Sequence, residues 1–153
     1  MAADGGYGPV PSNQILVAGQ PLIQILKVKT ATGCYPGRLV MKDTTDGQIK
    51  ASDGTQFIGW LGYEQTIKKY RPANEDTEYT AGDHVAVLNG GRFVIVASLS
   101  ATCQAIAKGE LLSGTAAGEL SGGTAGTHHI VAIAEESTTK SASAQDIMVR
   151  SLI

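Results

Sequence analysis

The chain has 153 residues, of which 42% are hydrophobic and only 17% are charged, and its formal net charge is −2. This length suits one domain, or one domain with an arm, and it is enough to bury a core without disulfides or metals. The charge argues against an electrostatic nucleic-acid binder, no apolar run is long enough to cross a membrane, and the N-terminus lacks the pattern of a secretory signal.

The residue composition favours strands over helices. The chain contains 19 glycines but only 5 Tyr, 2 Phe and 1 Trp, and each glycine inside a helix costs about 1 kcal/mol. Cys34 and Cys103 are too few for a disulfide framework. We interpret them as free thiols in a reducing cytoplasm, while the sequence leaves a bond between them open.

The N-terminal stretch Met1–Ser12 is rich in glycine and proline. Such a segment cannot form a helix or a packed strand, so it is either a frayed terminus or an extended arm that becomes ordered on a partner. We predict an extended arm over residues 1–20 and a β domain over residues 21–153. The arm side chains that could contact a partner are Tyr7, Pro9, Val10, Pro11, Ile15 and Val17.

The segment Gln14–Lys29 predicts extended structure with a break at Gly19–Pro21. Apolar residues on both of its faces are typical of a strand that is buried on two sides. At its end, Lys27 and Lys29 suit the edge of a sheet.

A repeated stretch organises the remainder of the chain. Residues Gly37–Thr66 recur as Gly109–Thr138 at an offset of 72 (109 − 37). Only the glycine-rich middle slips by one residue, as expected for a tolerated loop deletion. Each copy predicts a strand, a turn, a strand, a turn and a strand. The matched pairs include Leu39 with Leu111, Ile58 with Ile130, Trp60 with Ala132, and Glu64 with Glu136.

Other elements surround the two copies. Ile67–Thr80 is charged and contains Pro72, which excludes a central strand, so we expect a surface loop or a hairpin tip; contact with a neighbouring subunit is its functional alternative. Tyr79–Ser98 predicts a hairpin around the Asn-Gly-Gly of residues 89–91, because Asn-Gly supplies the positive φ angles of a tight turn. Asp146–Ile153 predicts a terminal strand within the sheet.

About nine to eleven short strands with regular turn signals are typical of a sandwich or a barrel. We therefore predict an all-β fold, a compact β-barrel or β-tulip-like domain with an internal repeat, in which the two copies form flaps on the central hairpin. If the copies form one barrel, Trp60 should lie in its core opposite the small residues near Ala132. If they form two lobes, Trp60 should lie at the junction.

The sequence contains little that points to catalysis. His128 and His129 are adjacent and would point to opposite faces of a strand, so they cannot easily share a metal ion. No histidine is placed near Cys34, and we interpret Glu64 and Glu136 as strand ends at the surface. No phosphate-binding loop or nucleophile elbow is present. We therefore expect no enzyme activity, no metal and no cofactor.

Three short motifs resemble the tailed-phage head decoration proteins, which are also called capsid cement or stabilising proteins. These motifs are Y-x-A-G-D-x-V-x-V at Tyr79–Val87, K-G-E-L-L at Lys108–Leu112 and A-I-A-E at Ala132–Glu135. The terminal strand Asp146–Ile153 also fits, and the resemblance covers about residues 30–153.

The resemblance implies a barrel or β-tulip that assembles as a homotrimer on the capsid exterior and locks neighbouring major capsid protein subunits together. It also implies that the N-terminal arm lies on the capsid and adds a strand to it, so the six arm side chains become candidate capsid-binding residues. The expected location is the virion, after synthesis in the host cytoplasm, with neither nucleic acid nor a membrane as a partner.

Two other functions are open at this stage. A tail, fibre or sugar-binding module would be favoured by Trp60, Tyr35 or Tyr70 exposed on one concave face. A small trimeric β enzyme, such as a nucleotide hydrolase, would need an Asp-centred metal site. The candidate aspartates lie in turns without the expected surroundings: Asp43, Asp46 and Asp53.

Overall fold

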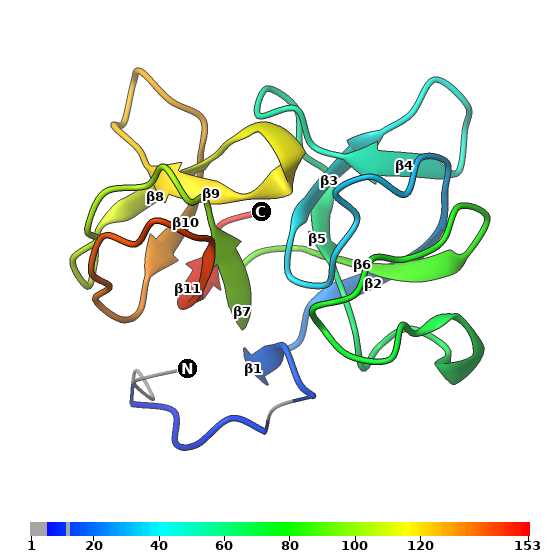
Figure 1. Ribbon diagram of the computed structural model, residues 1–153, viewed down its shortest axis with the longest axis horizontal. Helices are drawn as coiled ribbons and strands as arrows, with labels where there is room; N and C mark the ends of the chain where they lie inside the picture. The colour runs from blue at the N-terminus through cyan, green and yellow to red at the C-terminus, as the bar shows by residue number, and fades with distance from the viewer. Residues whose placement is uncertain (1–5, 12) are drawn as a thin grey trace.

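Two closed five-stranded β-barrels lie side by side in the computed structural model, which describes residues 6–11 and 13–153 (Figure 1). The prediction of an all-β barrel fold is confirmed. The described residues form eleven strands and two short 3-10 helices. None of these helices has the length and hydropathy needed to cross a membrane.

The first barrel has the strand order β2-β4-β3-β5-β6, and β6 pairs back onto β2. Its strands are β2 (Leu22–Val28), β3 (Leu39–Lys42), β4 (Gln48–Ala51), β5 (Gly59–Leu61) and β6 (His84–Asn89). The second barrel has the order β7-β9-β8-β10-β11, and β11 pairs back onto β7. Its strands are β7 (Val94–Leu99), β8 (Leu111–Gly114), β9 (Leu120–Gly122), β10 (Ile130–Ala134) and β11 (Gln145–Ser151). The remaining elements are β1 (Leu16–Ala18), which pairs with β7, and the 3-10 helices η1 (Lys68–Tyr70) and η2 (Ala116–Gly118).

The two barrels are copies of each other. In each barrel the first and third strands of the chain pair in parallel and every other pairing is antiparallel. The parallel pairs match in register, since Val28 lies opposite Ile49 and Leu99 lies opposite Leu120, and each residue is shifted by 71 (99 − 28 and 120 − 49). The three-strand prediction for each repeat copy is thus confirmed, and the duplication extends to all five strands.

The charged segment of residues 67–80 explains why the sequence repeat is shorter than the structural one. It lies in the connection of residues 62–83 between β5 and β6, whereas the second barrel uses only residues 135–144 between β10 and β11. The longer connection reduces the difference in residue number between equivalent positions of the two barrels. Val87 on β6 is equivalent to Val149 on β11, and the difference there is 62 (149 − 87). A search at the constant offset of 72 therefore misses the last strand.

The predicted hairpin over residues 79–98 is wrong, because β6 and β7 belong to different barrels and do not pair. Residues 90–93 instead connect the barrels. Gly90, Gly91 and Arg92 all have positive φ angles, of 98°, 67° and 62°, and the N–H groups of Gly91 and Arg92 bond to the carbonyl oxygens of Ile153 and Ser151. The C-terminal strand thus takes the hydrogen bonds that a hairpin partner would have used, and no central ribbon exists.

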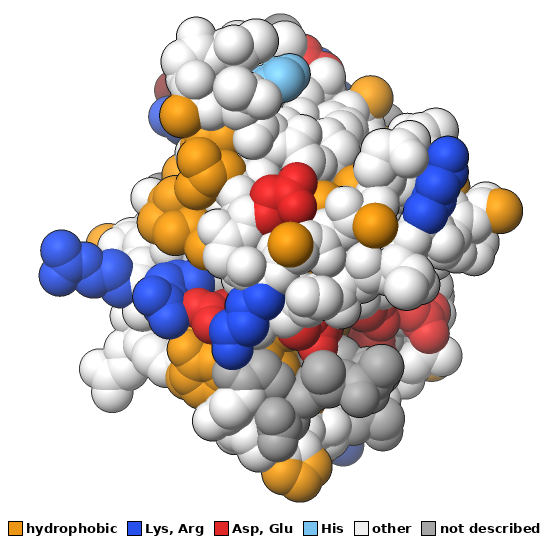
Figure 2. Space-filling model, turned by 90° about the vertical axis from the view of Figure 1, so that its left-hand side faces the viewer, with side chains coloured by type: hydrophobic (Ala, Val, Ile, Leu, Met, Phe, Trp, Pro, Cys, Tyr) orange, Lys and Arg blue, Asp and Glu red, His pale blue; other side chains and the backbone are white. Residues whose placement is uncertain are grey.

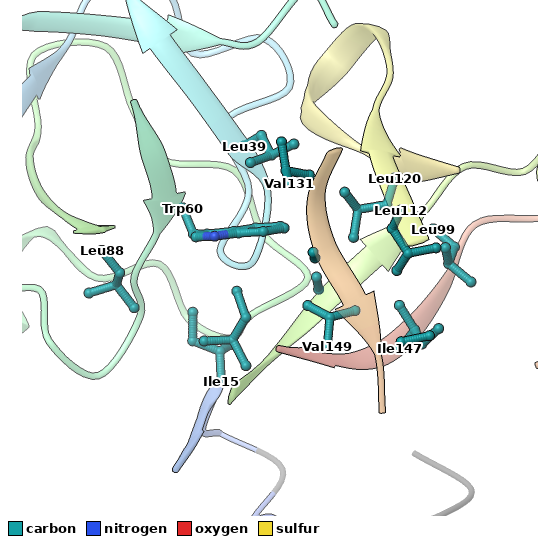
Figure 3. Close-up of a cluster of buried hydrophobic side chains, with 14 of the residues drawn as sticks. Ile15, Leu39, Trp60, Leu88, Leu99, Leu112, Leu120, Val131, Ile147 and Val149 are labelled. Carbon is teal, nitrogen blue, oxygen red and sulfur yellow. The ribbon is translucent and has the colours of Figure 1, made fainter. Parts of the chain in front are cut away.

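Trp60 lies at the junction between the barrels, as expected for two lobes (Figure 3). Its neighbour Leu61 points into the first barrel, so Trp60 points out of that barrel. It is 0% exposed, and its Nε1 donates a hydrogen bond to Ser151 Oγ on β11 at 2.9 Å. The strand pairing matches Trp60 with Ile133 instead of Ala132, because Leu39 pairs with Trp60 and its repeat mate Leu111 pairs with Ile133.

The turn between β8 and β9 forms a second contact between the barrels. Arg38 pairs with Glu119 at 3.2 Å, and the Gly118 N–H donates to the Ser52 carbonyl oxygen at 3.1 Å. Gly118 has a φ of 72°, and a Cβ there would lie 2.3 Å from the backbone oxygen of Leu39. Only glycine satisfies both the left-handed backbone and this close approach.

The prediction that the strand before Lys29 is buried on two sides is wrong for the first half of β2. Leu22, Ile23 and Ile25 are all exposed, whereas Val28 is buried in the core of the first barrel. The predicted break at Gly19–Pro21 is confirmed, since it separates β1 from β2.

Candidate functional site

The strongest candidate for a functional site is the N-terminal segment, where it crosses the junction between the barrels (Figure 1). β1 pairs antiparallel with β7, with Leu16 opposite Ile95. The N–H of Val96 donates a hydrogen bond to the Ile15 carbonyl oxygen at 2.8 Å. The Ile15 side chain is only 2% exposed and belongs to the same core cluster as Trp60.

A carboxylate from the first barrel holds the same segment. Glu64, which follows β5, accepts hydrogen bonds from the backbone N–H groups of Ile15 at 3.1 Å and Leu16 at 2.8 Å. Hydrogen bonds to a charged acceptor are roughly twice as strong as neutral ones. Arg71 steadies the loop by donating to the carbonyl oxygens of Glu64 and Thr66. We call this arrangement of Ile15 and Leu16 between Glu64 and β7 the arm clasp.

Before the arm clasp, the chain runs along the second barrel. Arg150 Nη2 on β11 donates to the Tyr7 hydroxyl at 3.4 Å. Among the six predicted capsid-binding side chains, that of Ile15 is built into the core of its own chain. The others keep exposed or half-exposed surface: Tyr7, Pro9, Val10, Pro11 and Val17.

A shallow pocket beneath the arm contains three carboxylates, those of Glu75, Asp76 and Asp146. Asp146 keeps exposed surface, but partial desolvation of its carboxyl group, followed by the charge of Asp76, raises its pKa. Ionised Asp146 therefore costs the folded state free energy at neutral pH. Within residues 6–11 and 13–153, no group of His, Cys, Asp and Glu side chains could hold a metal ion.

The interpretation of Glu64 and Glu136 as surface strand ends is wrong. Glu64 is half-buried in the arm clasp, and Glu136 is only 6% exposed and accepts the N–H of Met148 at 2.9 Å. Both carboxylates bind backbone amides. The two glutamates occupy equivalent positions in the repeat, and this equivalence was the one indication in the sequence that they share a structural role. The sequence does not show which backbone amides they bind.

The two cysteines are buried, and His128 and His129 contact neighbouring groups of their own chain. Cys34 and Cys103 are buried free thiols, and burial raises the pKa of Cys34 to about 11. The Cys34 thiol therefore stays protonated at neutral pH and is a poor nucleophile. His128 Nδ1 accepts the Thr124 N–H at 3.0 Å, and His129 packs edge-on against a phenylalanine ring.

The surface on the side of the second barrel has no large area of one charge. Charged side chains on this face occur in small groups separated by uncharged surface (Figure 2). This pattern agrees with the net charge of −2 and differs from the basic stripe of a nucleic-acid binder.

Comparison with known protein families identifies a family that covers most of the chain. A family model described as "Structural cement protein (E217 gp24/Pam3 gp6)" matches residues 12–152. The matched region is 141 residues long (152 − 12 + 1) and contains β1 and both barrels. Among curated proteins, no sequence matches the chain.

Proposed function

The chain belongs to the phage structural cement protein family, and from this premise we propose that it bridges neighbouring major capsid protein subunits on the outer surface of the capsid. Its role is structural and capsid-stabilising, and its place is the virion capsid. In our proposal it acts as a homotrimer whose N-terminal arms add strands to the capsid. We also propose that it is made in the host cytoplasm, has no enzymatic activity and needs neither nucleic acid nor a membrane.

The observation that carries the proposal is the arm clasp. Because Glu64 comes from one barrel and β7 from the other, a pull on the arm is resisted by both barrels. An added strand contributes main-chain hydrogen bonds, while side-chain pockets set its register. Pro9 and Pro11 carry no N–H, so the arm can donate ladder bonds only from the residues around them.

Three arms on one trimer would strengthen weak contacts. Once one arm is bound, the next contacts become intramolecular, and avidity can exceed the single-arm affinity by about 10²–10⁴. A stiff pair of barrels suits this arrangement because it fixes the distance between the contacts.

The first experiment removes residues 1–11, which leaves the arm clasp intact. We expect the truncated protein to keep its fold and, by light scattering, the same number of subunits per particle. It should bind undecorated capsids at least about tenfold more weakly. The heat resistance that it gives those capsids should fall in parallel. Equal binding by the intact and truncated proteins would refute the proposed role of the arm.

A matched pair of substitutions separates the arm from general surface effects. Val10→Asp places a charge on the half-buried arm side chain, and Ala105→Asp places the same charge on an exposed loop of the second barrel. We expect Val10→Asp to weaken capsid binding and Ala105→Asp to leave it unchanged. A larger effect from Ala105→Asp would move the binding surface away from the arm.

The alternative functions lack support from the site. Trp60 is fully buried, Tyr35 lies under the Arg38 guanidinium at 4.4 Å, and the Tyr70 ring packs 5.6 Å from that of His84. These three aromatic side chains do not form the exposed platform that a sugar-binding face would need.

A further inference from the structure

Among the residues that the structure describes, the edge of β2 is apolar, exposed and unpaired over its first half. The exposed fractions are 68% for Leu22, 52% for Ile23 and 48% for Ile25. β4 pairs with β2 only at Lys27 and Val28. An apolar edge strand without a partner is a template for pairing with another strand.

The hydrogen-bond pattern shows which backbone groups are free. The N–H of Lys27 donates toward β4 and the N–H of Val28 donates toward β6, both at 2.9 Å. In an antiparallel ladder, successive residues direct their backbone groups to opposite edges. The N–H and C=O groups of Ile23 and Ile25 therefore point to the same edge as those of Lys27, and no described residue bonds them there.

The second barrel shows the equivalent edge with a strand on it. At the offset of 71 that relates Val28 to Leu99, Ile25 corresponds to Val96 (96 − 25). The N–H of Val96 is bonded by the Ile15 carbonyl oxygen, and β1 continues along this edge. The same barrel design thus accepts an antiparallel strand at the edge that stays open on β2.

The sequence of the open edge favours one occupant. Residues 22–26 read Leu-Ile-Gln-Ile-Leu, the same in both directions. Antiparallel pairing of two such segments around Gln24 places Ile23 opposite Ile25 and Leu22 opposite Leu26. Each Ile23–Ile25 pair can then exchange both of its N–H···O=C bonds, and facing β-branched side chains stabilise such a ladder.

We infer that the open edge of β2 pairs with the same edge of a second copy of this chain, around a two-fold axis at Gln24. Such a contact uses the same surface on both copies, so it joins copies in pairs. If a separate three-fold contact elsewhere on the molecule forms the proposed trimer, this two-fold contact would link one trimer to the next. The inference does not depend on capsid binding, and its test needs no capsid.

Sedimentation equilibrium of the purified protein tests the contact. We expect the first association step to double the mass of the particle as the concentration rises, and Ile25→Lys to weaken that step at least about tenfold. Ile133→Lys is the matched control, because Ile133 is a half-exposed isoleucine on a strand whose two edges are both paired. Circular dichroism establishes that each variant is folded.

Cysteine crosslinking tests the register. In the proposed contact, Gln24 of one copy lies opposite Gln24 of the other in a non-hydrogen-bonded pair. The two Cα atoms are then about 4.5 Å apart, a distance that a disulfide can span. Leu22 would lie about 13 Å from its own copy along the strand. We therefore expect Gln24→Cys to form a disulfide dimer under mild oxidation and Leu22→Cys not to, while the native cysteines stay buried.

Three results would overturn the inference. One is a wild-type mass that does not rise with concentration. Another is a Leu22→Cys variant that crosslinks as readily as Gln24→Cys. The third is an Ile25→Lys variant that self-associates as strongly as the wild type; if this variant also loses capsid binding, the edge of β2 belongs to a strand of the capsid.

Discussion

Replacing Trp60 by alanine tests how the two barrels are joined. The side chain is fully buried and lies between Leu39 and Leu88 of the first barrel and Val131 and Val149 of the second (Figure 3). Burial of a tryptophan removes about 150–250 Å² from water, which at about 25 cal/mol per Å² gives an upper bound of about 4–6 kcal/mol. We expect Trp60→Ala to lower the free energy of unfolding by about 3–5 kcal/mol.

The assay is urea unfolding followed by far-ultraviolet circular dichroism, which reports on both barrels. Leu61→Ala is the matched control, since Leu61 is the next residue and is equally buried, but inside the first barrel. It should cost about 2–5 kcal/mol and keep one cooperative transition, whereas Trp60→Ala should separate or broaden the transitions of the two barrels. The reasoning fails if Trp60→Ala costs less than about 1 kcal/mol, or if Leu61→Ala separates the transitions to the same extent.

Three further predictions concern the arm clasp, the pocket beneath the arm and the turn between β8 and β9. Glu64→Gln keeps the shape of the acceptor but removes its charge, so hydrogen exchange at the two arm amides that it binds should become faster by up to about tenfold; unchanged protection would contradict the clasp. The raised folded-state pKa of Asp146 means that protonated Asp146 is favoured in the folded protein. The folded state is therefore fully stable, as far as this group is concerned, at acidic pH, and it loses stability as the pH rises through that pKa and Asp146 ionises. Asp146→Asn should therefore raise the melting temperature at pH 7, and the difference from the wild type should close toward pH 4; a constant difference would be contrary evidence. Gly118→Ala should cost at least about 2 kcal/mol in urea unfolding, because strain and a clash with a backbone oxygen act together. Its repeat mate Gly47 has a similar φ of 74° but open space around it, so Gly47→Ala should cost only about 1 kcal/mol; equal costs would refute the role of the close approach.

The fold class followed from the sequence because strand and turn signals are local. Glycine-rich turns and short apolar runs specify β3, β4 and β5, and the same pattern 72 residues later specifies β8, β9 and β10. The closing strands could not be matched in this way, because the longer connection after β5 shifts β6 out of the common offset.

The Asn-Gly-Gly at residues 89–91 shows where local reasoning fails. The left-handed backbone that these residues favour is present at Gly90 and Gly91, yet the chain continues into another barrel. Closure of a hairpin requires that β6 and β7 prefer each other to their other partners. β6 has β2 and β5, and β7 has β11, so the turn signal is used to connect two barrels.

The candidate site depends on contacts that are far apart in the sequence. Ile15 and Glu64 are 49 residues apart, and they meet only where the first barrel packs beside β7 of the second. The glycines and prolines of the sequence predict an arm, and the family resemblance predicts its partner surface, but the sequence could not show that residues 15 and 16 are fixed to their own chain.

The duplication accounts for the asymmetry between the barrels. Two equivalent barrels present two equivalent strand edges, on β2 and β7, and within the described part of the chain one segment, β1, covers one of them. That segment lies on β7, and the connection to β2 is then only residues 19–21 long. Ile23 and Ile25 therefore stay exposed at the edge of β2. Their backbone N–H and C=O groups point outward from that edge, in the direction needed to bond a further strand. Folding of a single chain gives no reason for apolar side chains at this edge, whereas pairing with a second copy does.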